Sequence, residues 1–180
     1  CHLSGEGVSG GGHLIDRALG TFPQPNISSD ETGGVGAWTD KEIARVVRHG
    51  VRRDGTLAFG MPRFESMADA DIAAVLAFTR SANESFSPDP QMRPRPTLSI
   101  EGKLRYAFLI GVPDFNRATT EVTLPPPGPT VEYGAYMANA VYLCVECHTE
   151  GSIGASVASK EKSPFFYAGG VEFADEQGRP

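Results

Sequence analysis

The sequence has few cysteines, no excess of basic residues and no long apolar run. Only 3 of its 180 residues are Cys, and 16 Lys and Arg residues are outnumbered by 22 Asp and Glu residues, for a net charge of −6. Without a basic stripe, nucleic acid is not an expected partner. No stretch approaches the roughly 18 apolar residues of a membrane-spanning helix, so we expect no transmembrane segment in this chain.

Glycine and proline, in contrast, are abundant. The chain has 21 Gly and 14 Pro, with a hydrophobic fraction of 40% and a charged fraction of 21% that are ordinary for a soluble globular protein. This composition predicts a loop-rich fold, as when a large cofactor replaces part of the hydrophobic core.

Two of the cysteines belong to the motif C-V-E-C-H at Cys144–His148. C-x-x-C-H is the attachment signature of c-type haem: both thiols add to the vinyl groups, and the adjacent His binds iron. A zinc or redox C-x-x-C is the alternative, but no second C-x-x-C is present to complete a zinc site. We therefore predict covalent haem at Cys144 and Cys147, with His148 as an iron ligand.

The third cysteine, in Cys1-His2, matches the last two letters of the same motif. The alternative is a lipid-modified cysteine that happens to precede a His. If Cys1 binds haem and His2 binds iron, all three cysteines serve haem attachment, and the chain carries two haems c. Because c-type haem is attached outside the bacterial cytoplasm, the expected location is periplasmic or otherwise extracytoplasmic.

Local patterns predict three helices and no clear strand. The first, 39–49, has a Thr39/Glu42 capping box and a Gly50 stop. The second, 69–79, begins with acidic residues that suit its dipole and has Ile72, Val75, Leu76, Phe78 and Thr79 on its buried side. The third, 132–143, leads into Cys144. The fold class is therefore all-α.

Prolines divide the chain into three parts. Residues 83–130 contain Pro88, Pro90, Pro94, Pro96 and the run Pro125–Pro129, and such stretches are stiff and extended. We expect a first domain at 1–82, this linker at 83–130 and the start of a second domain at 131–180. Within the linker, the periodicity of 102–111 does not distinguish helix from strand.

The stretch 25–80 resembles the cytochrome c domains of diheme and triheme cytochrome subunits of membrane-bound alcohol and gluconate dehydrogenases. The shared motifs fall in the family's order: P-N-I-S-S-D-E-T-G-G-V-G-A-W from Pro25, G-V-R-R-D-G from Gly50, M-P-R-F from Met61 and M-A-D-A-D-I from Met67. The region before Cys144 matches the G-x-Y-[LM]-x-x-A that opens the family's next domain. The resemblance implies two cytochrome c-like domains.

Three departures from the family pattern stand out. The first motif lacks its leading Cys and the N-terminal helix that normally precedes it, and the second domain ends before a P-N-I-T loop or a distal Met. We therefore expect both domains to be incomplete and the sequence to be part of a longer multihaem cytochrome. Ala68 replaces the family's Ser helix cap, which weakens that helix end.

The family pattern implies Met61 as the distal iron ligand of the first haem, with Met67 as the rival. A thioether ligand raises the reduction potential. Core packing is the alternative role for either Met. His13 and His49 are further candidates, which would give bis-His ligation and a lower potential.

Other polar groups could orient the haem. A proximal His usually donates its second N–H to a carbonyl, and Pro23 or Pro25 could supply one. Asn26, Trp38, Arg52 and Arg53 carry donors that suit haem propionates. Ordinary turns and surface loops are the alternatives.

These features predict an electron carrier rather than an enzyme, because six-coordinate iron has no open position for a substrate. Redox proteins, as subunits of a larger membrane-associated complex, are the expected partners, with any membrane anchoring through other subunits or missing ends. The alternative is a haem enzyme with an open axial site, such as a peroxidase or a sulfur-compound dehydrogenase. A haem sensor or a scaffold subunit also stays open.

Overall fold

The computed structural model describes residues 2, 9–11, 13–16, 19–105, 107–108, 122–150 and 160–170. Its elements in chain order are β1 (His13–Asp16), β2 (Gly20–Pro23), α1 (Asp40–His49), α2 (Asp69–Thr79), η1 (Glu84–Phe86), β3 (Thr97–Leu98), α3 (Ile100–Arg105), α4 (Val131–Tyr136), η3 (Met137–Val141) and α5 (Val145–His148). Most of the regular structure is helical, in agreement with the predicted class.

A small sheet was not predicted from the sequence. β1, β2 and β3 form an antiparallel sheet in that order, with Leu14 opposite Phe22 and Thr21 opposite Thr97. Its strands have four, four and two residues, too few for an alternating apolar pattern to stand out.

Helix α1 forms as predicted, with a capping box at its start. The Thr39 hydroxyl accepts from the Glu42 N–H, and a Glu42 carboxylate oxygen accepts from the Thr39 N–H at 2.8 Å. The helix ends at Gly50, whose φ of 66° lies in the left-handed region that glycine adopts without a Cβ clash.

Helix α2 has the predicted bounds but a narrower buried face than expected. Ile72 is buried, whereas Val75 and Phe78 are 38% and 55% exposed. The rings of Phe78 and of Phe86 in η1 pack edge to face, with their centroids 5.2 Å apart. The prediction that Val75 and Phe78 are buried is therefore wrong, because periodicity identifies an apolar stripe but not how much of it a neighbour covers.

The third predicted helix is α4 followed by a π-helical turn, η3. The Tyr142 N–H donates to the Met137 carbonyl at 2.8 Å, and the Cys144 N–H donates to the Ala138 carbonyl at 2.8 Å. Leu143 has a φ of 52°, unusual for a residue with a side chain. The widened turn and this left-handed residue redirect the chain into the C-x-x-C-H motif.

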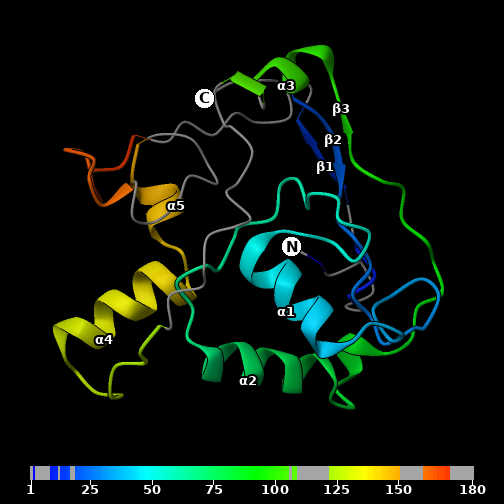
Figure 1. Ribbon diagram of the computed structural model, residues 1–180, viewed down its shortest axis with the longest axis horizontal. Coiled ribbons are helices and arrows are strands. Elements are labelled where there is room, and N and C mark those ends of the chain that lie inside the picture. The colour runs from blue at the N-terminus through cyan, green and yellow to red at the C-terminus, as the bar shows by residue number, and fades with distance from the viewer. Residues whose placement is uncertain are drawn as a thin grey trace.

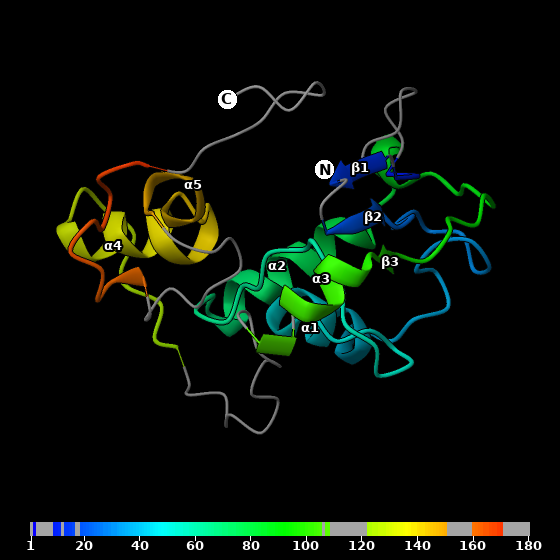
Figure 2. The same cartoon turned by 90° about the horizontal axis from the view of Figure 1, so that it is seen from above.

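The elements form two groups. The first group comprises β1, β2, α1, α2, η1, β3 and α3; the second comprises α4, η3, α5 and the segment 160–170. In both views α4 and α5 lie to one side, away from the sheet, and α1 packs against α2 (Figures 1 and 2). The buried residues Ala68, Tyr136 and Ala140 form a cluster where the groups meet.

Part of the predicted linker belongs to the first group. β3 pairs with β2, and the Ser99 N–H donates to the Leu19 carbonyl at 2.9 Å. Residues 84–105 are thus folded onto the first group rather than extended between two domains. Among the described helices, none is long and apolar enough to cross a membrane.

Candidate functional site

The C-x-x-C-H motif occupies one turn of helix. Cys144 precedes α5, and its carbonyl accepts the N–H groups of Cys147 at 3.2 Å and His148 at 3.0 Å. Both cysteines are free thiols; Cys144 is half-buried, while Cys147 and His148 are exposed. This single turn therefore presents two thiols and an imidazole at an accessible surface.

A buried lysine contacts the backbone and a side chain of this turn. Lys160 is 3% exposed, and its ammonium lies 3.3 Å from the Glu146 carbonyl and 3.3 Å from a Glu146 carboxylate oxygen. Val145 and Thr149 are also fully buried. Val145, Glu146 and Thr149 thus hold the turn in place, while the two thiols stay accessible.

His148 is positioned by the segment 160–170. Its carbonyl accepts the Gly169 N–H at 2.8 Å, and its ring stacks on Tyr167 with centroids 6.5 Å apart. The Tyr167 hydroxyl bonds Asn139 at 2.6 Å, and its N–H donates to the Thr149 hydroxyl at 3.0 Å. Burial raises the pKa of Tyr167, so the phenol keeps its proton.

His2 makes one of the predicted contacts. Its Nδ1 lies 2.9 Å from the Pro25 carbonyl, which confirms a loop carbonyl as the partner and selects Pro25 over Pro23. Because a carbonyl only accepts, Nδ1 carries the proton and Nε2 presents its lone pair. Burial lowers the pKa of His2 and the Pro25 bond opposes it, so the neutral ring that binds metals is favoured. Cys1 lies outside the described residues.

A closely packed backbone positions His2. The His2 carbonyl accepts the Gly11 N–H at 2.8 Å, and the Ile27 N–H donates to the Ser9 carbonyl at 2.9 Å. Gly11 has a φ of 85°, and a Cβ there would lie 2.3 Å from the Gln24 carbonyl oxygen. Only glycine therefore allows this approach of 9–11 to the loop that carries Pro25.

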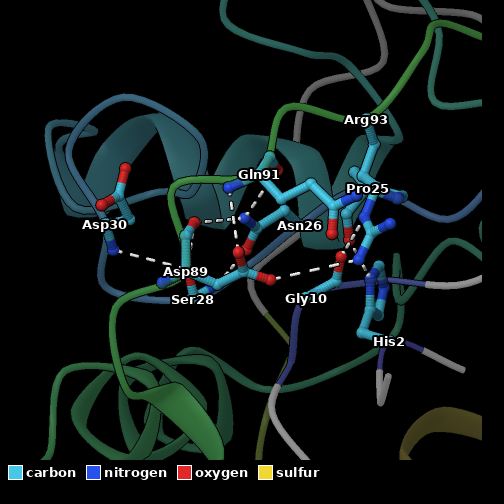
Figure 3. A network of polar contacts seen from close by, with 9 residues as sticks. All are labelled: His2, Gly10, Pro25, Asn26, Ser28, Asp30, Asp89, Gln91 and Arg93. Atoms are coloured by element: carbon cyan, nitrogen blue, oxygen red, sulfur yellow. Dashed lines mark hydrogen bonds and ion pairs between the residues drawn. The ribbon is translucent and has the colours of Figure 1, made fainter. Parts of the chain in front are cut away.

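Asn26, next to Pro25, joins that loop to a distant segment (Figure 3). It is 5% exposed, and its amide nitrogen donates to the carbonyls of Asp89 at 2.7 Å and Gln91 at 3.1 Å, while its oxygen accepts the Ser28 N–H at 2.9 Å. Arg93 extends the network by donating to the Gly10 carbonyl. Both Asn26 donors are used within the protein, so its amide has no N–H left for a haem propionate.

Trp38, Arg52 and Arg53 lie at the two ends of α1. The Trp38 carbonyl accepts from Arg80, and the Arg52 carbonyl accepts from Arg45 at 2.6 Å. Arg53 pairs with Glu42 at 3.2 Å. Trp38 and Arg52 are half-buried, and burial lowers the pKa of Arg52. These contacts fix the backbone at both positions.

The two candidate methionines differ in burial. Met61 lies in coil after the Val51–Leu57 bridge and is half-buried, whereas Met67 is 4% exposed at the start of α2. The carbonyl of Met67 accepts from Arg48 at 2.9 Å. His49 is half-buried at the end of α1, and its pKa is lowered by burial and then by Arg48. The side chain of His13 lies outside the described residues.

The sequence did not predict the roles of Lys160 and Tyr167, or the structural role of Asn26. No motif marks Lys160 or Tyr167, since both contact a helix turn that lies more than ten residues earlier in the sequence. The P-N-I pattern did mark Asn26, but the partners of its amide lie more than 60 residues later.

The donor set fits c-type haem at the second motif and at His2. Two accessible thiols and an imidazole share one turn, and His2 has the hydrogen bond that orients a ligand imidazole. No protein-family model matches the sequence.

Relatives resemble the chain over most of its length. It is 32% identical over 180 residues, 96% of the chain, to the alcohol dehydrogenase (quinone) cytochrome c subunit of Gluconacetobacter polyoxogenes, and spans 36% of that protein. It is 29% identical to the gluconate 2-dehydrogenase cytochrome c subunit of Pantoea cypripedii, covering 85% of the chain and 35% of the relative. It is also 29% identical to a diheme cytochrome c-type protein of Cereibacter sphaeroides, covering 83% of the chain and 52% of the relative. The resemblance predicted from the motifs is confirmed, and the chain spans about a third of the first two relatives.

Proposed function

We propose that this chain, similar to the cytochrome c subunits of quinone-dependent and gluconate dehydrogenases, transfers electrons through two covalently bound haems c. The observation that carries the proposal is the accessible turn 144–148, which presents two thiols and an imidazole together. The relatives' names and the His2–Pro25 hydrogen bond support it.

The residues divide into attachment and ligation. Cys144 and Cys147 hold one haem covalently and Cys1 holds the other, with His148 and His2 as the proximal ligands. Haem iron supplies a reversible one-electron couple when bound. The protein orients each imidazole: Pro25 fixes the tautomer of His2, and the Gly169 and Tyr167 contacts fix His148.

Met61 is the proposed distal ligand of the first haem. A ligand sulfur must reach the surface that contacts the macrocycle, and half-buried Met61 meets that requirement better than Met67, whose side chain is almost completely buried. Trp38 and Arg52 remain our candidates for propionate contacts, whereas Asn26 holds the loop that carries Pro25.

The partners follow from the relatives. Several of the similar proteins are named as cytochrome subunits of alcohol, gluconate or fructose dehydrogenases. We propose that this chain accepts electrons from a dehydrogenase subunit at the periplasmic side of a membrane and passes them to the respiratory or photosynthetic chain. In this proposal the chain acts as an electron carrier, like the cytochrome subunits that it resembles, rather than as the catalytic subunit.

Haem content tests the proposal. A pyridine haemochrome assay on the native protein should give two haems per chain; one haem would contradict the two-site assignment. Carbon monoxide should bind the reduced first haem poorly, whereas tight binding would support a haem enzyme with an open axial site.

Substitution identifies the distal ligand. Met61→Ala should abolish the far-red sulfur–iron absorption band and lower the potential of the first haem. Met92→Ala is the matched control, because Met92 is 74% exposed. If Met67→Ala abolishes the band and Met61→Ala does not, Met67 is the ligand.

A further inference from the structure

The start of α2 lacks the side-chain cap that the start of α1 has. The first residue before α2 is Ala68, which makes no side-chain hydrogen bond. At α1 the carboxylate of Glu42 accepts directly from the Thr39 N–H. The corresponding position in α2 holds Asp71, whose side chain is one methylene shorter than that of Glu.

The phenol of Tyr136, from the second group, supplies the missing cap. The Ala68 N–H donates to the Tyr136 hydroxyl at 2.9 Å, and that hydroxyl donates to an Asp71 carboxylate oxygen. The arrangement is a capping box with the Tyr136 oxygen inserted between its two usual partners. Burial and the Asp71 hydrogen bond raise the pKa of Tyr136, so the hydroxyl keeps the proton that it donates.

Arg48 of α1 contacts both residues next to Ala68. It donates to the Met67 carbonyl at 2.9 Å and pairs with the Asp69 carboxylate at 2.7 Å, so both neighbours of Ala68 are linked to α1. Ala68 is 2% exposed and packs with Tyr136 and Ala140. The Tyr136 hydroxyl therefore links the start of α2, in the first group, to α4, the helix that leads toward Cys144.

We propose that the Tyr136 hydroxyl is the joint that holds the two haem-binding groups in one fixed relative position. This inference rests on the proposed function, since it assigns one haem to each group. A fixed joint keeps the distance between the haems constant, and electron exchange depends on that distance. Tyr136 is thus a positioning residue for transfer between the haems.

Hydrogen exchange in the native haem-loaded protein tests the joint. Tyr136→Phe should speed amide exchange by about tenfold or more in both 67–76 and 131–143, because it removes a buried hydrogen bond to a charged group. Tyr142→Phe is the matched control, since it removes a phenol hydroxyl from the same peptide at a position that is 70% exposed.

A second substitution distinguishes the linkage of the two groups from the capping of α2. In Tyr136→Phe combined with Asp71→Glu, the longer carboxylate can reach the Ala68 N–H directly, as Glu42 reaches Thr39. Exchange in 67–76 should recover, while 131–143 stays fast and electron exchange between the haems stays slower than in the unmodified protein.

Two results would overturn the proposal that Tyr136 holds the two groups together. The first is unchanged exchange in both segments of Tyr136→Phe. The second is an unchanged rate of electron exchange between the haems in both variants, which would leave the phenol as a helix cap alone. Haem content is a separate measurement: a protein without two haems refutes the proposed function, while the exchange pattern still decides whether Tyr136 joins the groups.

Discussion

Asn26 should contribute more to stability than any exposed polar residue in its loop. Replacement of Asn26 by Ala removes three hydrogen bonds, to the Asp89 and Gln91 carbonyls and from the Ser28 N–H. Each such bond contributes about 1 kcal/mol, so the free energy of unfolding should fall by about 3 kcal/mol.

The Asn26→Asp variant sharpens the prediction. It is nearly the same size and keeps an oxygen for the Ser28 N–H, but it replaces the donor with a carboxylate oxygen facing two carbonyls. Because a buried charge opposite acceptors is unfavourable, Asn26→Asp should be at least as destabilising as Asn26→Ala at neutral pH. A side chain that served only to fill space would tolerate this change.

Denaturant unfolding followed by circular dichroism measures both effects. Asn83→Ala is the control, because the side chain of exposed Asn83 accepts one hydrogen bond, from the Ser85 N–H at 3.0 Å. It should cost about 1 kcal/mol or less. The reasoning fails if Asn26→Asp unfolds at the same denaturant concentration as the unmodified protein. A lowered midpoint together with a changed potential of the first haem would show that Asn26 also holds Pro25 against His2.

Two further predictions concern charged groups. Hydrogen bonds from the Thr56 side chain and backbone, followed by the smaller contributions of Arg95, lower the pKa of Asp54 from 3.8 to about 2. The Asp54 carboxylate therefore stabilises the fold above pH 3.8, and this contribution is lost as the pH falls toward 2. Thermal unfolding of Asp54→Asn should therefore depend less on pH in this window than that of the unmodified protein, and an identical pH profile would contradict the assignment. Lys160→Met removes the ammonium that faces Glu146 and should destabilise the fold by about 3 kcal/mol in denaturant unfolding. Lys160→Met combined with Glu146→Gln should cost less, and equal costs would show that the ion pair is not the cause.

The sequence alone determined the parts whose causes are local. The bounds of α1 and α2 follow from Thr39, Glu42 and Gly50 and from the apolar pattern after Asp69, all within a few residues of the effect. The motif at Cys144–His148 is equally local, because one helical turn is enough to bring its three groups together. The hydrogen bond of His2 to a loop carbonyl was also predicted, although the choice between Pro23 and Pro25 was not.

Only the tertiary structure decided which distant groups complete these elements. The amide of Asn26, the ammonium of Lys160 and the hydroxyl of Tyr136 each satisfy backbone or side-chain groups that lie at least 14 residues away. No periodicity marks such partners, because a buried polar group can be satisfied by any donor or acceptor that the chain path brings near. The same reason explains Val75 and Phe78: their apolar stripe is visible in the sequence, but the surface that neighbouring elements cover depends on where those elements pack.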